Sequence, residues 1–129
     1  MALAIEVGGR TQDGVQVSTV VKLVGSLDAD TVAQAEKVVK PLLAAPPKVL
    51  VFDLAGLTFV SSAGIGILIA ARKAVEAKAG SCFYSGPQPQ IRKVFDIMKA
   101  LPKASVFGSE RELDEYLAEI QRKVTDGDD

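Results

Sequence analysis

Two adjacent serines, Ser61 and Ser62, are the residues of this sequence best placed to do chemistry. They stand between an apolar run that ends at Val60 and the segment Ala63-Gly64-Ile65-Gly66, which opens a predicted helix. Either hydroxyl can accept a hydrogen bond from the free backbone N–H groups of the first helical turn. A phosphate on Ser62 would lie at the same helix N-terminus, where those N–H groups and the helix dipole favour negative charge. The pair is therefore both a predicted helix cap and a candidate site of modification.

The absence of histidine excludes the common catalytic arrangements of serine and cysteine. Without His the chain can form no Ser-His-Asp triad, no Cys-His pair and no histidine metal site. A single Cys82 cannot build a structural zinc site, and its apolar surroundings predict a buried small side chain. Gly64-Ile65-Gly66 lacks the Gly-Lys-Ser/Thr of a phosphate loop, so the sequence disfavours a nucleotide-binding domain or small enzyme. We predict a binding protein that has no catalytic activity, metal or cofactor.

Asp53 raises one further possibility, the phosphoacceptor of a receiver domain. Such a domain opens with a strand that ends in paired acidic residues, whereas the first apolar run here ends in Val7-Gly8-Gly9. Asp53 also lies before the end of its predicted strand. The sequence therefore disfavours this interpretation.

Length and charge limit the partners. The 129 residues are enough for one domain with its own core. Fifteen basic and sixteen acidic residues give a formal charge of −1, so no basic field would attract nucleic acid. The longest uncharged apolar run, Ala63 to Ala71, is about half of the roughly 20 residues that span a bilayer. The N-terminus lacks a secretory signal pattern, and we expect a cytoplasmic protein.

Strand and helix patterns alternate after an opening hairpin. The predicted hairpin joins Leu3–Val7 to Val15–Val24, with Gly8, Gly9, Asp13 and Gly14 between the strands. Asp28 or Asp30 is expected to cap a helix that reaches Pro46, and residues 48–54 form a continuously apolar central strand. A second helix is expected from Ser61 or Ser62 to Gly80, with Gly64 and Gly66 allowing close packing on the sheet. The next predicted elements are a strand at residues 81–84, a helix at 90–98 and a strand at 104–107. A final helix is expected to begin with a capping box at Ser109–Glu112 and to turn Leu113, Leu117 and Ile120 toward the core.

This order predicts an α/β fold with a mixed, mostly parallel sheet of about five strands and about four helices. The domain is expected to occupy residues 1–124. Residues 125–129 are acidic and lack apolar side chains, which predicts a disordered tail.

The segment Val51–Gly66 resembles the signature of anti-sigma factor antagonists, which are STAS domains. Its sequence, Val-Phe-Asp-Leu-Ala-Gly-Leu-Thr-Phe-Val-Ser-Ser-Ala-Gly-Ile-Gly, is similar to the family pattern Asp-Leu-Ser-x-Val-x-Phe-Ile-Asp-Ser-Ser/Thr-Gly-Leu-Gly. Gly25-Ser26-Leu27-Asp28 is similar to the family's Gly-Glu-Leu-Asp, and residues 86–94 to its later Pro-x-Val-Arg segment. The resemblance covers about Val15 to Ile120 and implies a single STAS domain.

The resemblance also implies a function and its residues. In that family the serine after the signature aspartate is phosphorylated by a kinase that is itself the anti-sigma factor, and a phosphatase reverses the modification. Ser62 matches that serine, with Ser61 as the second choice. The implied partner-binding residues are Asp28, Ser61, Ser62, Ala63, Gly64 and Ile65. The implied protein is a transcription regulator of bacterial type that works by partner switching, as a monomer or weak homodimer.

Two positions depart from the family pattern and keep an alternative open. Ser61 stands where the family has aspartate, and Ala63 stands where it has serine or threonine. These residues also suit an unphosphorylated STAS adaptor or scaffold subunit, for example in a stress-signalling assembly or a lipid-transport complex.

Overall fold

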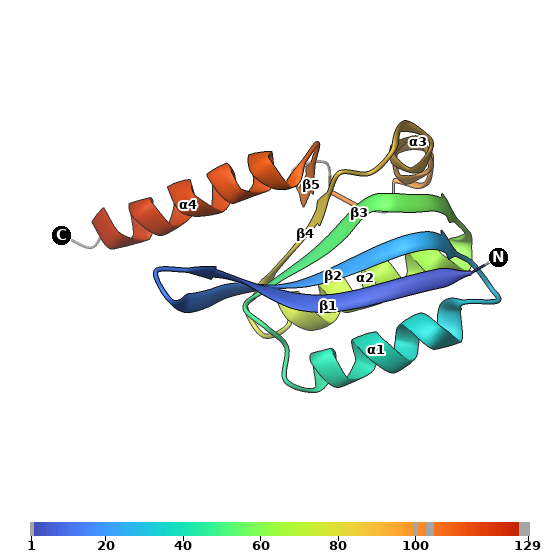
Figure 1. The fold of residues 1–129 in the computed structure, drawn as a ribbon, viewed down its shortest axis with the longest axis horizontal. Coiled ribbons are helices and arrows are strands. Elements are labelled where there is room, and N and C mark those ends of the chain that lie inside the picture. The colour runs from blue at the N-terminus through green and yellow to red at the C-terminus, as the bar shows by residue number, and fades with distance from the viewer. Residues whose placement is uncertain (1, 100, 103–104, 127–129) are drawn as a thin grey trace.

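The computed structural model describes residues 2–99, 101–102 and 105–126. Strands and helices alternate along the chain after an initial hairpin (Figure 1). In chain order the elements are β1 (Leu3–Gln12), β2 (Val15–Leu27), α1 (Val32–Ala44), β3 (Val49–Val60), α2 (Ser62–Glu76), β4 (Ser81–Ser85), α3 (Pro89–Met98), β5 (Val106–Phe107) and α4 (Glu110–Asp126).

All five of these strands form one sheet, in the order β1-β2-β3-β4-β5. Only β1 and β2 are antiparallel, and the other three neighbouring pairs are parallel. Each parallel connection needs a crossover, and α1, α2 and α3 supply the helices between successive parallel strands. The predicted mixed, mostly parallel sheet is confirmed. Its central strand is also confirmed, although β3 continues to Val60, beyond the predicted end at residue 54.

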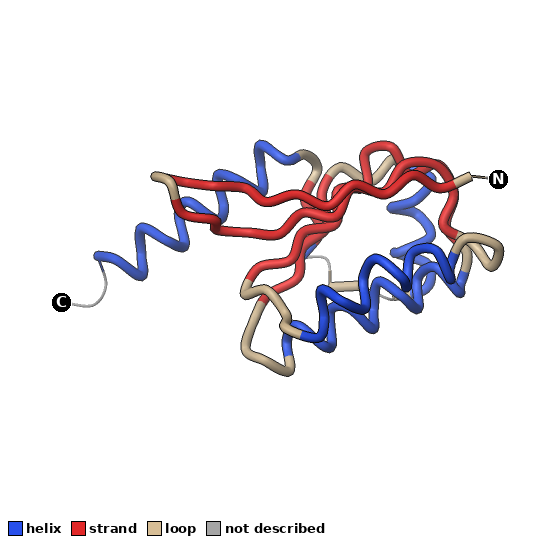
Figure 2. Tube along the Cα trace, turned by 60° about the horizontal axis from the view of Figure 1, so that its bottom comes forward, coloured by secondary structure: helices blue, strands red, loops and turns tan. Residues whose placement is uncertain are grey.

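Alternation along β3 divides the core into two parts. Leu50 and Phe52 belong to the larger cluster, while Val51 points to the opposite face with Phe83 and Leu113. Figure 2 shows α1 and α2 together on one side of the sheet. Helix α4 packs on the other face, where Leu113 joins Val51 and Phe83. Both faces of β3 are thus buried near its centre, which explains its continuously apolar sequence.

The hairpin is longer than predicted. Gly8 and Gly9 lie inside β1 rather than in the connection, and the turn contains only Asp13 and Gly14. Both turn residues have positive φ, 54° and 79°, the combination found in two-residue type I′ hairpins. The Asp13-Gly14 pair is therefore sufficient to form the hairpin turn, and Gly8 and Gly9 are part of the strand instead.

Several helix boundaries and faces also differ from the predictions. Helix α1 continues past Pro41 to Ala44, close to its predicted end at Pro46, whereas α2 ends at Glu76, before the predicted stop at Gly80. In α4, Leu113 is buried as expected, but Ile120 is exposed because it lies beyond the part of the helix that packs on the sheet. The capping box is partly formed: Ser109 Oγ accepts the Glu112 N–H at 3.2 Å, while the Glu112 carboxylate accepts from Gly108 rather than from Ser109.

Two predictions fall partly outside the described residues. Strand β5 contains Val106 and Phe107, whereas residue 104 of the predicted strand is not described. Helix α4 includes Thr125 and Asp126, the first two residues of the expected disordered tail, and residues 127–129 lie outside the described part. Helices extend beyond their packed segment because each added residue contributes a hydrogen bond at little further entropic cost. Within the described ranges, no helix is long and apolar enough to cross a membrane.

Candidate functional site

The two loops that carry the predicted site residues meet where β2 and β3 end, at the right of Figure 1. The Ser61 N–H donates to the Leu27 carbonyl at 2.9 Å, which joins the two strand ends directly. A side chain at Gly64 would place its Cβ 2.5 Å from the same carbonyl oxygen. The first turn of α2 can therefore approach the end of β2 this closely only because residue 64 is glycine.

Ser61 is the N-cap of α2. Its backbone is extended (φ −96°, ψ 174°), and its hydroxyl accepts a hydrogen bond from the Gly64 N–H at 3.3 Å. The side chain is half-buried against the helix start. The hydroxyl thus satisfies one of the backbone donors that an α-helix leaves free at its N-terminus.

Ser62 is the first residue of α2 and is exposed. Within the described residues its hydroxyl has no hydrogen-bond partner, so it is free to react or to bind. It lies on the outer surface of the first helical turn, near N–H groups that favour an anion. Geometry and exposure distinguish the two serines: one holds the helix end, and the other is presented to solvent.

Asp28 has a structural role in the neighbouring loop. One carboxylate oxygen accepts from the Asp30 and Thr31 N–H groups at 3.0 and 3.2 Å, and the Asp28 N–H donates to Thr31 Oγ1 at 3.0 Å. These bonds close the turn before α1. The N-cap of α1 is Thr31 rather than the predicted Asp28 or Asp30, and its hydroxyl donates to the buried Ser26 carbonyl at 2.8 Å.

The other predicted partner-binding residues differ in accessibility. Ala63 is exposed, whereas Gly64 and Ile65 are buried beneath the surface. Gly64 packs against the end of β2, as predicted, and Ile65 is part of the main core. Ala63 is open to direct contact, and the two buried residues position the loop from below.

Gly66 does not pack on the sheet, which corrects the prediction for the second glycine. It is exposed, and a Cβ there would meet nothing within 4 Å. It lines a groove of about 280 Å³ between α1 and α2, with Ala63, Ile67 and Ala70 on one side and Glu36 and Lys40 on the other. The groove adjoins the predicted site, because its lining includes Ala63, the residue that follows Ser62.

Phe59 is a candidate contact residue that sequence reasoning missed. It lies on β3 two residues before Ser61, and 47% of its surface is exposed. Phe59 lies beyond the strand predicted at residues 48–54, and no sequence signal showed that its side chain is exposed. An exposed aromatic ring near the end of β3 suits a protein contact, because aromatic residues are enriched at interfaces.

We name the exposed residues around this corner the switch surface: Phe59, Ser62, Ala63 and Gly66. The Asp28 turn and Ser61 support it from the side. Its four residues are small or apolar and carry no charge. Charged side chains border it in the Asp28 turn and at the Glu36–Lys40 pair, whose charged atoms are 3.5 Å apart.

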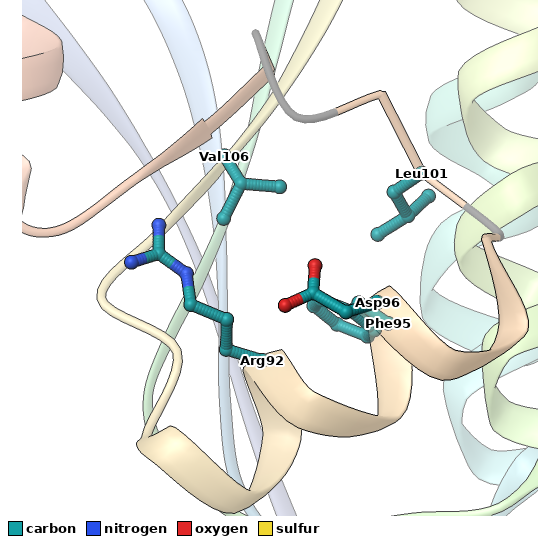
Figure 3. A pocket seen from close by; sticks show the side chains of 5 residues that line it. All are labelled: Arg92, Phe95, Asp96, Leu101 and Val106. Atoms are coloured by element: carbon teal, nitrogen blue, oxygen red, sulfur yellow. The ribbon is translucent and has the colours of Figure 1, made fainter.

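Other parts of the described structure offer less chemistry. Asp53 is buried within β3, and one of its carboxylate oxygens accepts the Ala55 N–H at 3.1 Å. Figure 3 shows a separate cavity of about 240 Å³ between α3 and β5, into which Arg92 and Asp96 extend beside Phe95, Leu101 and Val106. No group of three or more potential metal ligands occurs among the described side chains.

Cys82 is buried in β4, as its sequence context predicted. Burial raises the pKa of its thiol from 9.0 to about 12, so the reactive thiolate is suppressed at neutral pH. Burial likewise raises the pKa of its neighbour Tyr84, whose hydroxyl donates to the Leu68 carbonyl at 3.2 Å. Neither group is available for chemistry at the surface.

Comparison with known proteins agrees with this fold. The STAS domain model matches residues 9–113. An anti-sigma F factor antagonist from Lysinibacillus sphaericus is 32% identical over 79 residues, which cover 60% of this chain and 68% of that protein.

Solved structures show the same architecture. An anti-sigma factor antagonist from Mycobacterium paratuberculosis superposes with a TM-score of 0.72 at 23% identity, over 93% of this chain and 95% of that one. The phosphorylated form of the Bacillus cell fate determinant SpoIIAA gives a TM-score of 0.68 at 22% identity, over 88% and 99% of the two chains. At these identities the structural likeness establishes the fold alone. The fold and the sequence match together show that the chain belongs to the STAS domain family and is a homologue of the anti-sigma factor antagonists.

Proposed function

We propose that this protein is an anti-sigma factor antagonist that binds a kinase-type anti-sigma factor through the switch surface and is released when Ser62 is phosphorylated. The observation that carries the proposal is the position of Ser62, exposed and unbonded at the first residue of α2. A kinase must reach the hydroxyl that it modifies, and this hydroxyl lies at the surface. The homologous antagonist supports the same assignment, as does the existence of SpoIIAA, a protein of the same fold, in a phosphorylated form.

The physical effect of phosphate here is on association rather than on folding. A phosphoserine adds about −1.5 to −2 units of charge. At Ser62 that charge would lie at a helix N-terminus, which favours an anion, so the domain tolerates it. The neighbouring residue Ala63 is apolar and exposed, and a partner that fits the bare serine would have to bury the new charge on docking.

Ser61 fits this mechanism although the family pattern has aspartate there. Both residue types are good N-caps, and Ser61 makes the capping bond to Gly64. Its half-buried hydroxyl is therefore engaged in holding the helix end, which leaves Ser62 as the phosphoacceptor.

A direct test uses the anti-sigma kinase encoded nearest to this protein in its genome. The purified kinase, ATP and this chain are incubated, and the intact mass of the chain is measured. We expect one added phosphoryl group, its loss in Ser62→Ala, and its retention in the matched control Ser61→Ala.

The outcome separates the two functional hypotheses. If the kinase modifies its own known substrate or itself but leaves this chain unmodified, phosphorylation of Ser62 is refuted. Stable binding of a scaffold protein or transporter ATPase to the unmodified chain would then favour the adaptor function. Modification at Ser61 alone would contradict the assigned roles of the two serines.

A further inference from the structure

Strand β1 is an edge strand with one long side open. It pairs with β2 through residues Leu3 to Gln12 and has no other neighbour in the sheet of described strands (Figure 1). Free strand edges present unpaired N–H and C=O groups and are templates for pairing with another chain. Proteins commonly protect such edges with charges, proline or bulges. The residues along β1 therefore indicate whether this edge is protected or available for pairing.

The hydrogen-bond register shows which backbone groups point outward. Ser26 N–H donates to the Ala2 carbonyl, so these two residues form a hydrogen-bonded pair one step beyond the Leu3–Gly25 match. Hydrogen-bonded and non-hydrogen-bonded pairs alternate along an antiparallel ladder. Even-numbered residues of β1 therefore bond to β2, and the N–H and C=O groups of odd-numbered residues point to the open edge.

A contact from α1 supports this assignment independently. Gln34 Nε2 donates to the Leu3 carbonyl at 2.7 Å, as an outward-pointing carbonyl allows. The following odd-numbered residues, Ile5, Val7 and Gly9, have no such cover from any described residue. The uncovered part of the edge thus runs from Ile5 to Gly9 and includes Gly8.

The side chains around Gly8 carry opposite charges on one face. Glu6 and Arg10 are two residues to either side of it, and both line the same shallow hollow on the sheet face opposite α1 and α2. Arg10 is held there by α4, through an ion pair to Glu110 at 3.3 Å and a contact to Asp114. Gly8 itself has open space around it, since a Cβ there would meet nothing within 4 Å.

We propose that two copies of this chain form a homodimer by pairing their β1 strands antiparallel about Gly8. In this register Val7 of one copy faces Gly9 of the other, and both residues have the outward N–H and C=O groups that a hydrogen-bonded pair needs. Glu6 of one copy faces Arg10 of the other in a non-hydrogen-bonded pair, where side chains approach most closely. The two-fold axis repeats each contact, giving a closed, isologous interface.

Charge favours this register over the alternatives. Registers centred on Val7 or Gly9 place neither Glu6 nor Arg10 opposite a charged side chain. A shift that centred the pairing on Glu6 would oppose two carboxylates, and one centred on Arg10 would oppose two guanidinium groups. Like charges directly opposite one another destabilise a strand pair. The bulge between Arg10 and Thr11 then ends regular pairing, so the shared ladder is short. We expect a weak, concentration-dependent dimer that added salt dissociates, since exposed ion pairs are screened.

The dimer leaves the switch surface open. Pairing uses the Glu6–Arg10 part of β1, toward the hairpin turn, whereas the switch surface lies where β2 and β3 end. One assembly would therefore present two switch surfaces, and dimerisation can be tested without the kinase.

Complementary charge reversal tests the register by sedimentation velocity over a dilution series. Glu6→Arg places Arg opposite Arg10, and Arg10→Glu places Glu opposite Glu6, so each variant alone should be monomeric where the unaltered protein is dimeric. Mixing the two variants restores opposite charges at both positions and should give a heterodimer. Glu76→Arg, the same charge change on exposed α2, is the matched control and should leave the dimer intact.

Hydrogen exchange tests the backbone part of the claim without any substitution. Dimer formation should slow exchange of the Val7 and Gly9 amides and leave Gly8, already bonded to β2, unchanged. A protein that stays monomeric across the dilution series overturns the proposal. So does a dimer that survives Glu6→Arg, a mixture of the two charge variants that fails to associate, or slowed exchange that omits Val7 and Gly9.

Discussion

Ser61 and Ser62 are neighbours in the chain, yet their hydroxyl groups have different surroundings. The first accepts the Gly64 N–H and is half-buried, and the second is exposed and has no partner among the described residues. Substituting each by alanine should separate stability from regulation, because only Ser61 has a bond to lose.

We predict that Ser61→Ala lowers the free energy of unfolding by about 1 kcal/mol, the usual cost of losing an N-cap. Ser62→Ala should change it by less than about 0.5 kcal/mol, as expected for an exposed side chain. Urea unfolding followed by circular dichroism measures both values. Equal losses in the two variants would show that Ser62 also supports the helix end and would argue against its role as a free acceptor.

At the scale of elements, the N-terminal part of α2 contains two glycines with opposite surroundings. Gly64 faces the Leu27 carbonyl at a distance that excludes a Cβ, whereas Gly66 faces open space in the groove between α1 and α2. The same substitution at these two positions should therefore have opposite effects on stability.

Gly64→Ala should destabilise the protein by about 1–3 kcal/mol, because the helix end must move away from β2 to admit the methyl group. Gly66→Ala should be neutral or stabilise by up to about 1 kcal/mol through its better helix propensity. Thermal and urea unfolding report both changes. A neutral Gly64→Ala would mean that the close approach of α2 to β2 is not needed to hold the switch surface.

Most helices and strands could be predicted from the sequence, because the spacing of apolar residues and the position of turn-forming residues indicate local structure. The continuous apolar run of β3 indicated a strand buried on both faces, and the serine pair indicated the start of α2; both predictions are confirmed. The prediction failed where tertiary contacts decide. Gly8 and Gly9 resemble turn residues, but the Asp13-Gly14 turn placed them within a strand.

The candidate site was predictable only in part, for a similar reason. Sequence pattern located Ser61 and Ser62 at a helix start, but it does not state which hydroxyl is bonded. The sequence pattern also does not distinguish the exposed Phe59 from the buried Phe52, because both are phenylalanines. The same holds for the exposed Gly66 and the buried Gly64. The exposure of each residue depends on which strands and helices pack against it, and only the assembled fold determines that packing.

At the scale of the whole molecule, the fold separates three surfaces. The switch surface lies where β2 and β3 end, the β1 edge lies along one side of the sheet, and α4 covers part of the face away from α1 and α2. The switch surface is supported by a rigid core, with Gly64 and Ile65 buried beneath it. A charge added at Ser62 should therefore alter what binds there and leave the domain folded.

The affinity of the anti-sigma kinase for this protein, before and after phosphorylation of Ser62, tests that claim most directly. Titration calorimetry should show binding of the unmodified protein and a loss of at least about tenfold in affinity, roughly 1.4 kcal/mol, after modification. The free energy of unfolding should differ by less than about 1 kcal/mol between the two forms, because the helix N-terminus accommodates the phosphate. Equal affinity for both forms, or a modified domain that no longer folds, would contradict the account.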